Sequence, residues 1–342
     1  TPCCATPEVC SVHSRRGASA MSRGGARTYR RRMSQSVTSP PPGAPVTVTR
    51  IPDPAEPVPR VAWPTLLLLA GGYVLFAGST AAALSGLWPV PVSVLLNAVA
   101  IYVLFTVAHD AAHHSASSGG TFNRWMGRLS IPFISPLFSF SAFRFIHMQH
   151  HRFTNHDDGR DPDHYTMEGP SWQRLPRFAT LDISYLGFYA AHARTRPRRE
   201  FAELGAQLVV VVALLAWLLA TGHGWDVVVL YLIPQRLAIM YLAWAFDYLP
   251  HSRLHHKPTE DRLKTTRNRM GGERWISPLL LYQNYHLVHH LHPVVPFYRY
   301  IAVWRRNEAA YLDGDPALST LRGRPITADE YRAMRRLVED HG

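Results

Sequence analysis

The sequence predicts an all-α integral membrane protein with four transmembrane helices in two hairpins and a histidine-rich, metal-binding cap on the cytoplasmic side. Three observations lead to this prediction. Two long blocks of the 342-residue chain are apolar and almost free of charge, basic residues flank both blocks, and three groups of histidines have helical spacing. The first two observations define the membrane part, and the third defines the cap.

Each apolar block is long enough for two membrane spans of about 20 residues. The first block covers residues 65–107 and is broken by the proline-containing segment 88–91. The second covers residues 204–246 and is broken by the polar segment 221–226. Arg236 lies inside the second block, close to Pro234. A charge inside a membrane is a candidate functional residue, but we favour the interpretation that Arg236 reaches water near a kink.

The basic residues give the orientation of the spans. The formal net charge is +12, and arginines gather before residue 61, between residues 109 and 200, and after residue 250. Neither short turn inside a hairpin contains Lys or Arg. We therefore expect both termini, the middle loop and all histidine groups on the cytoplasmic side of an inner or plasma membrane. No nucleic-acid-binding module accompanies the positive charge, so we expect no nucleic-acid partner.

The N-terminal segment differs from the rest of the chain. Residues 1–60 are rich in Arg, Ser and Pro, and we expect them to be disordered, with residues 61–342 forming one membrane domain. Cys3, Cys4 and Cys10 are the only cysteines. The domain itself can therefore contain no disulfide and no thiolate metal site.

The histidine groups predict a metal centre. Residues three and four apart share one face of a helix, so each group directs its imidazoles into one volume. Neutral imidazole is a ligand for iron, zinc, copper and nickel, and eight such residues indicate more than one ion. The eight are His109, His113, His147, His150, His151, His286, His289 and His290. His114, by contrast, is rotated away from the face that carries His109.

Three functions compete for these histidines. A zinc hydrolase would need a general-base Glu beside the first histidine, where the chain has Asp110, and zinc sites rarely use more than four ligands. A histidine-rich metal transporter would place its ligands near the membrane midplane, whereas these lie at or beyond one face. A redox-active pair of irons fits the number, type and position of the ligands best.

Several further residues are candidates around the centre. Asp161 and Asp163, in a polar loop after the second group, can orient ligating imidazoles from outside. Asp247 and His251 are four residues apart at the end of the second block. We expect interfacial segments at residues 130–145 and 181–192, because both are apolar but short or interrupted. A capping box, Thr327 to Glu330, predicts a C-terminal docking helix.

Residues 62–300 resemble the membrane fatty acid desaturase and hydroxylase superfamily, and within it the cyanobacterial-type β-carotene ring hydroxylases. The resemblance rests on five motifs and on the run Pro296-Phe297-Tyr298. The motifs are His109-Asp110-Ala111-Ala112-His113, Met148-Gln149-His150-His151, Asp161-Pro162-Asp163-His164, Phe246-Asp247-Tyr248-Leu249-Pro250-His251 and Gln283-Asn284-Tyr285-His286-Leu287-Val288-His289-His290.

The resemblance implies a di-iron enzyme that uses O2 as co-substrate, with the eight histidines as iron ligands. His251 matches a ninth ligand of acyl desaturases, and Asp247 stands where those enzymes often have Asn. Return of oxygen to the substrate gives an alcohol, and loss of a second hydrogen gives an alkene. Because the chain has no haem, flavin or iron–sulfur motif, electrons must come from a ferredoxin or a cytochrome b5-like protein.

The substrate expected from the resemblance is a lipid, with the end ring of β-carotene ahead of an acyl chain. The stretch His255-His256-Lys257-Pro258 departs from the carotenoid-hydroxylase pattern. An acyl desaturase or hydroxylase therefore remains the alternative.

Overall fold

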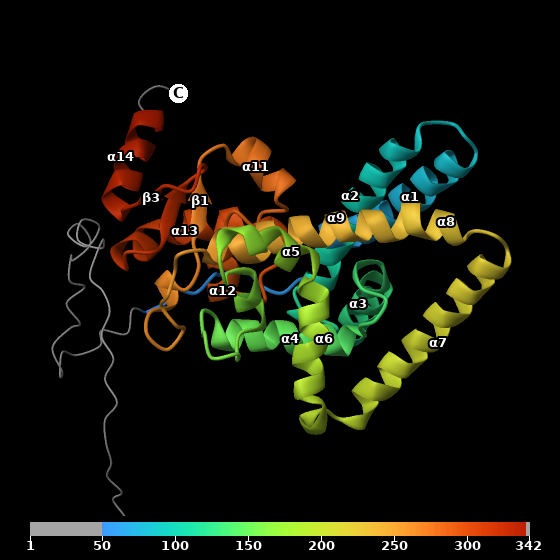
Figure 1. Cartoon of the computed structure of the whole chain (residues 1–342). Helices are drawn as coiled ribbons and strands as arrows, with labels where there is room; N and C mark the ends of the chain where they lie inside the picture. The colour runs from blue at the N-terminus through green and yellow to red at the C-terminus, as the bar shows by residue number, and fades with distance from the viewer. Residues whose placement is uncertain (1–49, 340–342) are drawn as a thin grey trace, which may run out of the picture. The chain divides into compact units, whose positions relative to one another are not determined.

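Four long apolar helical stretches form the membrane part of the protein, as the sequence predicts. The computed structural model describes residues 50–339, so residues 1–49, including the three cysteines, lie outside the described part. The four stretches are α1 (Trp63–Leu84), α2 (Val90–Ala112), α7 (Arg198–Ala220) and the interrupted stretch Gly224–His251. Each is long and apolar enough to cross a bilayer. Short turns join the first to the second and the third to the fourth, which confirms the two hairpins (Figure 1).

The fourth stretch alternates between α-helix and π-helix. It comprises α8 (Gly224–Val227), η4 (Val228–Leu232), α9 (Ile233–Leu242), η5 (Ala243–Tyr248) and α10 (Leu249–His251). Each π segment ends shortly before a proline, Pro234 or Pro250. Proline has no N–H and its ring clashes with the preceding turn, so the wider π turn relieves both problems. The second π segment leads directly into α10, which ends at His251.

A buried asparagine ties three of the spans together. The Asn97 side chain of α2 donates to the carbonyl of Leu230 at 2.7 Å and to the Thr80 hydroxyl at 3.0 Å, and it also contacts the Ser79 hydroxyl. Leu230 lies in the π segment η4. Such interhelical hydrogen bonds are favourable inside a membrane because no water can replace them.

The Arg236 side chain is 35% exposed, and it also forms specific bonds that the sequence does not show. Its guanidinium donates to the Asp182 carboxylate at 2.8 Å and to the carbonyl of Ala179 at 2.7 Å. Asp182 belongs to α6 (Leu181–Ala191). The ion pair therefore fastens α6, the predicted interfacial helix, to the fourth stretch.

The segment between the two hairpins is mostly helical. Its elements are α3 (Gly120–Ile134), α4 (Phe140–Phe153), η1 (Pro162–Thr166), η2 (Ser171–Gln173), α5 (Arg174–Ala179), α6 and η3 (Ala193–Thr195). The apolar segment predicted at residues 130–145 is the junction of α3 and α4, where residues 135–139 form no helix. Helix α4 begins with Ser139, whose hydroxyl accepts from the Ala142 amide.

The C-terminal part is mainly helical, and its elements pack around one apolar cluster. Its elements are η6 (Arg262–Lys264), β1 (Asn268–Met270), α11 (Glu273–Leu279), α12 (His286–Leu291), η7 (Phe297–Arg299), α13 (Tyr300–Asp313), β2 (Leu318–Thr320), β3 (Pro325–Ile326) and α14 (Ala328–Glu339). The strands are too short to form a core: β1 pairs parallel with β2, and β2 pairs antiparallel with β3. Trp304 stacks on Tyr311 with ring centroids 5.1 Å apart.

The ends of this part are fixed by specific contacts. At the start of α14, Thr327 and Glu330 exchange side-chain to backbone hydrogen bonds of 2.9 and 3.1 Å, which is the predicted capping box. Tyr331 then docks on the buried Trp304. Before α1, the extended segment 51–59 reaches α13, where Glu56 pairs with Arg306 at 2.8 Å.

Helices α3 and α4 approach so closely that a methyl group at Gly127 has no space. A Cβ built at Gly127 would lie 2.1 Å from ring atoms of the buried Phe140. We expect Gly127→Ala to destabilise the protein by about 1–3 kcal/mol because Phe140 and the start of α4 must shift. Thermal unfolding in detergent measures this effect. Gly78→Ala is the matched control, since a Cβ there meets nothing within 4 Å. Equal melting temperatures for the two variants would contradict the prediction.

Candidate metal centre

Four elements bring nine predicted histidines together. His109 lies in the last turn of α2 and His113 directly follows that helix. Helices α4, α10 and α12 supply the other seven. Two groups result, within each of which the ligand atoms lie within 4.8 Å of one another. One group contains His109, His113, His147, His151 and His289, and the other contains His150, His251, His286 and His290.

The two groups are in direct contact. The rings of His151 and His290, one from each group, stack with centroids 4.2 Å apart. Neighbouring histidines within the groups face each other through their Nε2 atoms. The shortest of these Nε2–Nε2 distances is 2.7 Å, between His113 and His147, and the longest is 3.3 Å, between His150 and His290. Each of the two groups could hold a metal ion.

The donor set fits metal ions. Nδ1 of His150 lies 2.8 Å from a carboxylate oxygen of Asp161, and Nδ1 of His286 lies 2.6 Å from Oε1 of Gln283. Because both oxygens are acceptors, these Nδ1 atoms carry the protons and the Nε2 lone pairs point into the centre. Two imidazole nitrogens about 2.1 Å from one ion and at right angles are about 3 Å apart, as the Nε2 atoms are here. A cation in each group would satisfy lone pairs that otherwise face one another.

The electrostatics of the site keep most imidazoles neutral. Burial, followed by the charges of neighbouring histidines, holds the pKa values of His113, His151 and His289 well below the usual range. Neutral imidazole is the form that binds metals. Burial alone would also lower the pKa of His150, but the carboxylates of Asp163 and Asp161 raise it to about 9. His150 is thus set apart from these histidines by two carboxylates beside its Nδ1.

The predicted carboxylates have different surroundings. Asp161 accepts from His150 and from the backbone amides of Asn155 and Asp163, at 2.8 and 3.0 Å. Asp163 lies 3.3 Å from Nδ1 of His150 and also accepts from Tyr185. Both carboxylates therefore lie beside Nδ1 of His150.

Asp247 lies outside the histidine groups. Its Oδ2 is buried and has no hydrogen-bond partner among the described residues. His251, four residues later, belongs to the group of four, and its Nε2 lies 3.2 Å from that of His286. His114 also lies apart: it adopts a left-handed conformation with φ of 59° and faces a different pocket.

A wall of aromatic rings closes one side of the centre. Phe143 stacks on His147 at a centroid distance of 5.7 Å, Phe246 meets His109 at 5.9 Å, and Phe105 contacts both Phe143 and Phe246. The same three rings, together with Asp247, line a narrow apolar cavity of about 50 Å³. Apolar groups beside the histidines exclude water from the place where a substrate would react.

Two side chains that form hydrogen bonds with the histidines were not identified from the sequence. Gln283 occupies the first position of the last of the five motifs, three residues before His286, so its position was a usable signal. The Tyr300 hydroxyl lies 2.9 Å from Nδ1 of His289, and no spacing rule links the two residues because Tyr300 starts a different helix. The aromatic wall was also missed, except that Phe246 belongs to a quoted motif.

Comparison with known proteins agrees with this geometry. The family model for fatty acid desaturases matches residues 85–322. The chain is 28% identical over 259 residues to a dihydrorhizobitoxine desaturase of Bradyrhizobium elkanii, covering 68% of this chain and 72% of the relative. It is 33% identical over 198 residues to a beta-carotene ketolase of Paracoccus sp., covering 57% and 71%. It is 26% identical over 267 residues to an sn-1 acyl-lipid omega-3 desaturase (ferredoxin) of Synechocystis sp., covering 68% and 69%.

The family match spans more than two thirds of the chain and includes every histidine of the two groups. The relatives include both a carotenoid enzyme and lipid desaturases, as the resemblance implied. The chain belongs to the fatty acid desaturase family and is a membrane oxidoreductase of the non-haem di-iron class.

Proposed function

We propose that this protein hydroxylates the end ring of a carotenoid, with O2 as co-substrate and two irons as its metal ions. The observation that carries the proposal is the pair of histidine groups closed by the rings of Phe105, Phe143 and Phe246. An oxidising metal centre behind an apolar wall suits a substrate that offers only C–H bonds. The match to a carotene ketolase supports a ring substrate.

The chain's own residues hold and protect this centre. The group of five would bind one iron and the group of four the other. Bound irons would activate O2 and accept electrons one at a time, which side chains alone cannot do. Asp161 and Gln283 keep the protons of His150 and His286 on Nδ1, so that both Nε2 atoms remain free for metal. The aromatic wall excludes water and leaves the substrate as the nearest oxidisable group.

A lipid-facing groove supports a wide substrate. The groove has a volume of about 880 Å³ and is lined mainly by apolar and aromatic side chains, among them Tyr102, Tyr241 and Trp244. Tyr102 lies 6.1 Å from Phe246 between ring centroids, and Phe246 contacts His109. The groove is thus two side chains away from the centre. Aromatic rings along an apolar groove suit a conjugated, ring-ended hydrocarbon.

Product analysis tests the proposal directly. Cells that make β-carotene should accumulate hydroxylated carotenoid when they express this protein with a ferredoxin system, and should not do so with the His289→Ala variant. A keto product would support the ring substrate but contradict hydroxylation as the reaction. Unchanged β-carotene beside new double bonds in membrane acyl chains would overturn the carotenoid proposal.

Acyl-chain desaturation is the second candidate, and one observation favours it. The cavity directly beside the histidines is narrow, about 50 Å³, and a thin chain enters such a space more readily than a substituted ring. The similarity to an acyl-lipid desaturase points the same way. The product assay separates the two substrates because each leaves a different product.

The electron donor and the orientation follow from charge. We propose that a ferredoxin, or a cytochrome b5-like protein, docks on the basic face that carries the histidines, and that this face is cytoplasmic. The arginines flanking the spans support the orientation, and a ferredoxin-dependent relative supports the donor.

The orientation gives a topology prediction. A reporter fused after Gly342 should be cytoplasmic, and a reporter inserted at Gly222 in the second turn should be on the opposite side. Two reporter enzymes measure the topology at each site, one that is active only in the cytoplasm and one that is active only in the periplasm. A periplasmic signal at Gly342 would reverse the orientation.

A further inference from the structure

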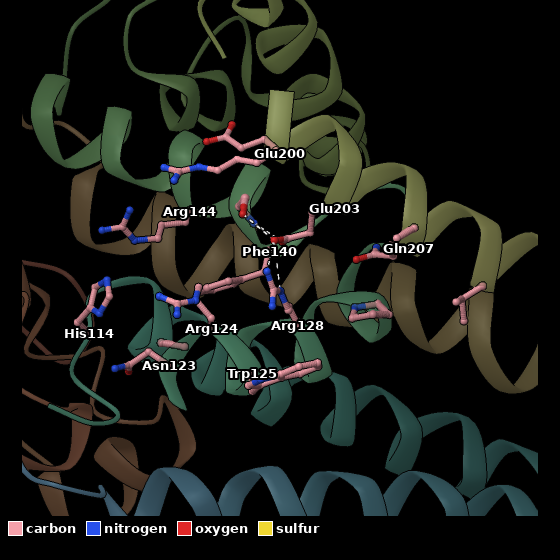
Figure 2. A pocket seen from close by; sticks show the side chains of 16 residues that line it. His114, Asn123, Arg124, Trp125, Arg128, Phe140, Arg144, Glu200, Glu203 and Gln207 are labelled. Atoms are coloured by element: carbon pink, nitrogen blue, oxygen red, sulfur yellow. Dashed lines mark hydrogen bonds and ion pairs between the residues drawn. The ribbon is translucent and has the colours of Figure 1, made fainter. Parts of the chain in front are cut away.

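A second pocket lies away from the histidine centre, between helices α3, α4 and α7. It has a volume of about 1080 Å³ and is open to the surface. Basic side chains form one part of its lining, namely His114, Arg124, Arg128, Arg144 and Arg199, and apolar ones form another, namely Trp125, Pro132, Phe140, Ala206 and Val210. Figure 2 shows His114, Arg124 and Arg144 at one end of the view and Gln207, on the membrane helix α7, at the other.

The acidic side chains of the pocket are already neutralised. Glu203 accepts from Arg128 at 2.7 Å and from the amide and hydroxyl of Ser141 at 3.0 Å, as the dashed lines of Figure 2 indicate. Glu200 accepts from Arg196 at 2.7 Å and from Tyr189 at 3.2 Å. The pocket therefore keeps an excess of positive charge.

Three arginines of the pocket have no carboxylate partner in the described part of the chain. Arg124 donates only to the Thr121 hydroxyl, and Arg144 donates through Nε to the carbonyl of Ala112. Arg199 is exposed and has no ion pair among residues 50–339. These three arginines therefore leave uncompensated positive charge on the lining of the pocket.

The position of the pocket identifies the source of its ligand. Arg199 stands at the start of the span α7, and Val210 lies eleven residues further, roughly 16 Å along the helix axis. None of the apolar window of α7 is buried, and Figure 1 shows α7 diverging from α3 and α4. The basic end is thus at the membrane surface, while the apolar end extends along a helix that faces acyl chains.

We propose that this pocket binds one anionic phospholipid from the leaflet on the histidine side, with its phosphate among Arg124, Arg144 and Arg199 and an acyl chain beside Ala206 and Val210. Guanidinium groups bind phosphate oxygens through paired, charge-assisted hydrogen bonds. Basic pockets between membrane helices are suited to lipid headgroups. The lipid site is independent of the substrate proposed above.

The bound lipid would also stabilise the metal-binding helices. Arg144 lies one turn before His147 on α4, and its contact with the Ala112 carbonyl places it beside His113. A phosphate on Arg144 would therefore link α2 and α4 at their histidine ends.

Lipid binding to the purified full-length chain tests the proposal. Native mass spectrometry in neutral detergent compares phosphatidylglycerol with phosphatidylcholine of the same acyl chains. We expect one phosphatidylglycerol per chain and a preference of about tenfold over phosphatidylcholine. Arg124→Gln with Arg199→Gln should remove the preference, and lysine at both positions should restore it. Ala206→Trp should weaken binding by filling the acyl end, although every charge remains.

The matched control removes two other exposed arginines, by Arg194→Gln with Arg305→Gln, and should keep the preference. Wild-type preference in the Arg124 and Arg199 double variant would overturn the proposal. So would displacement of the lipid by an equal concentration of inorganic phosphate, which would indicate a site for free anions. Unchanged lipid binding together with loss of ferredoxin-supported turnover would assign the pocket to the electron donor instead.

Discussion

Replacing His251 by alanine should abolish turnover and leave about one iron per chain. His251 belongs to the group of four, so its loss leaves three imidazoles in that group. His151 belongs to the group of five, and His151→Ala leaves four. We therefore expect both variants to lose activity by more than about 100-fold, with His251→Ala losing the more iron.

The iron content and the turnover rate of the two variants, His251→Ala and His151→Ala, are measured on protein purified from membranes. Both variants should still insert into the membrane, because the spans keep their backbone hydrogen bonds and apolar surface. His255→Ala is the control, since His255 is exposed and lies outside both groups. Two irons and normal activity in both variants would show that the two groups do not form the site.

The assignment of each histidine to an ion was beyond the sequence. Spacing correctly places His147, His150 and His151 on one helix face, because that depends only on helix geometry. The structure then puts His150 in one group and its neighbours in the other. This division depends on where α10 and α12 meet α4, and such tertiary packing has no local signal.

In the membrane part, too, the sequence predicts the helices but not the contacts between them. Apolar length predicts the four spans, and their ends differ from the expected ones by a few residues. The partner of Arg236 is Asp182, 54 residues earlier in the chain. The partner of Asn97 is the carbonyl of Leu230, whose donor four residues later in an α-helix would be Pro234, which has no N–H. In both cases the sequence shows a polar residue in an apolar block but not the group that binds it.

We expect the second large effect from replacing Asp161, which forms a hydrogen bond with the predicted ligand His150 but is not itself a predicted ligand. Asp161→Asn keeps the shape of the side chain but replaces one oxygen by an NH2 group. In the wild type, one oxygen faces Nδ1 of His150 and the amide of Asp163, and the other faces the amide of Asn155. The NH2 group must therefore face an N–H donor in either orientation, which costs about 1–3 kcal/mol.

We expect Asp161→Asn to weaken iron binding in the group of four by about 10–100-fold, because His150 loses the carboxylate that fixes its tautomer and raises its basicity. Competition with a chelator measures iron affinity, and thermal unfolding measures the cost of the mispaired amide. Asp158→Asn is the control from the same loop: Asp158 is exposed and, among residues 50–339, forms ion pairs only with Arg160 and His156. Asp163→Asn should have a smaller effect, since Asp163 lies farther from Nδ1 of His150, at 3.3 Å, and also binds Tyr185. Equal iron affinities for Asp161→Asn and Asp158→Asn would mean that His150 keeps its orientation through packing alone.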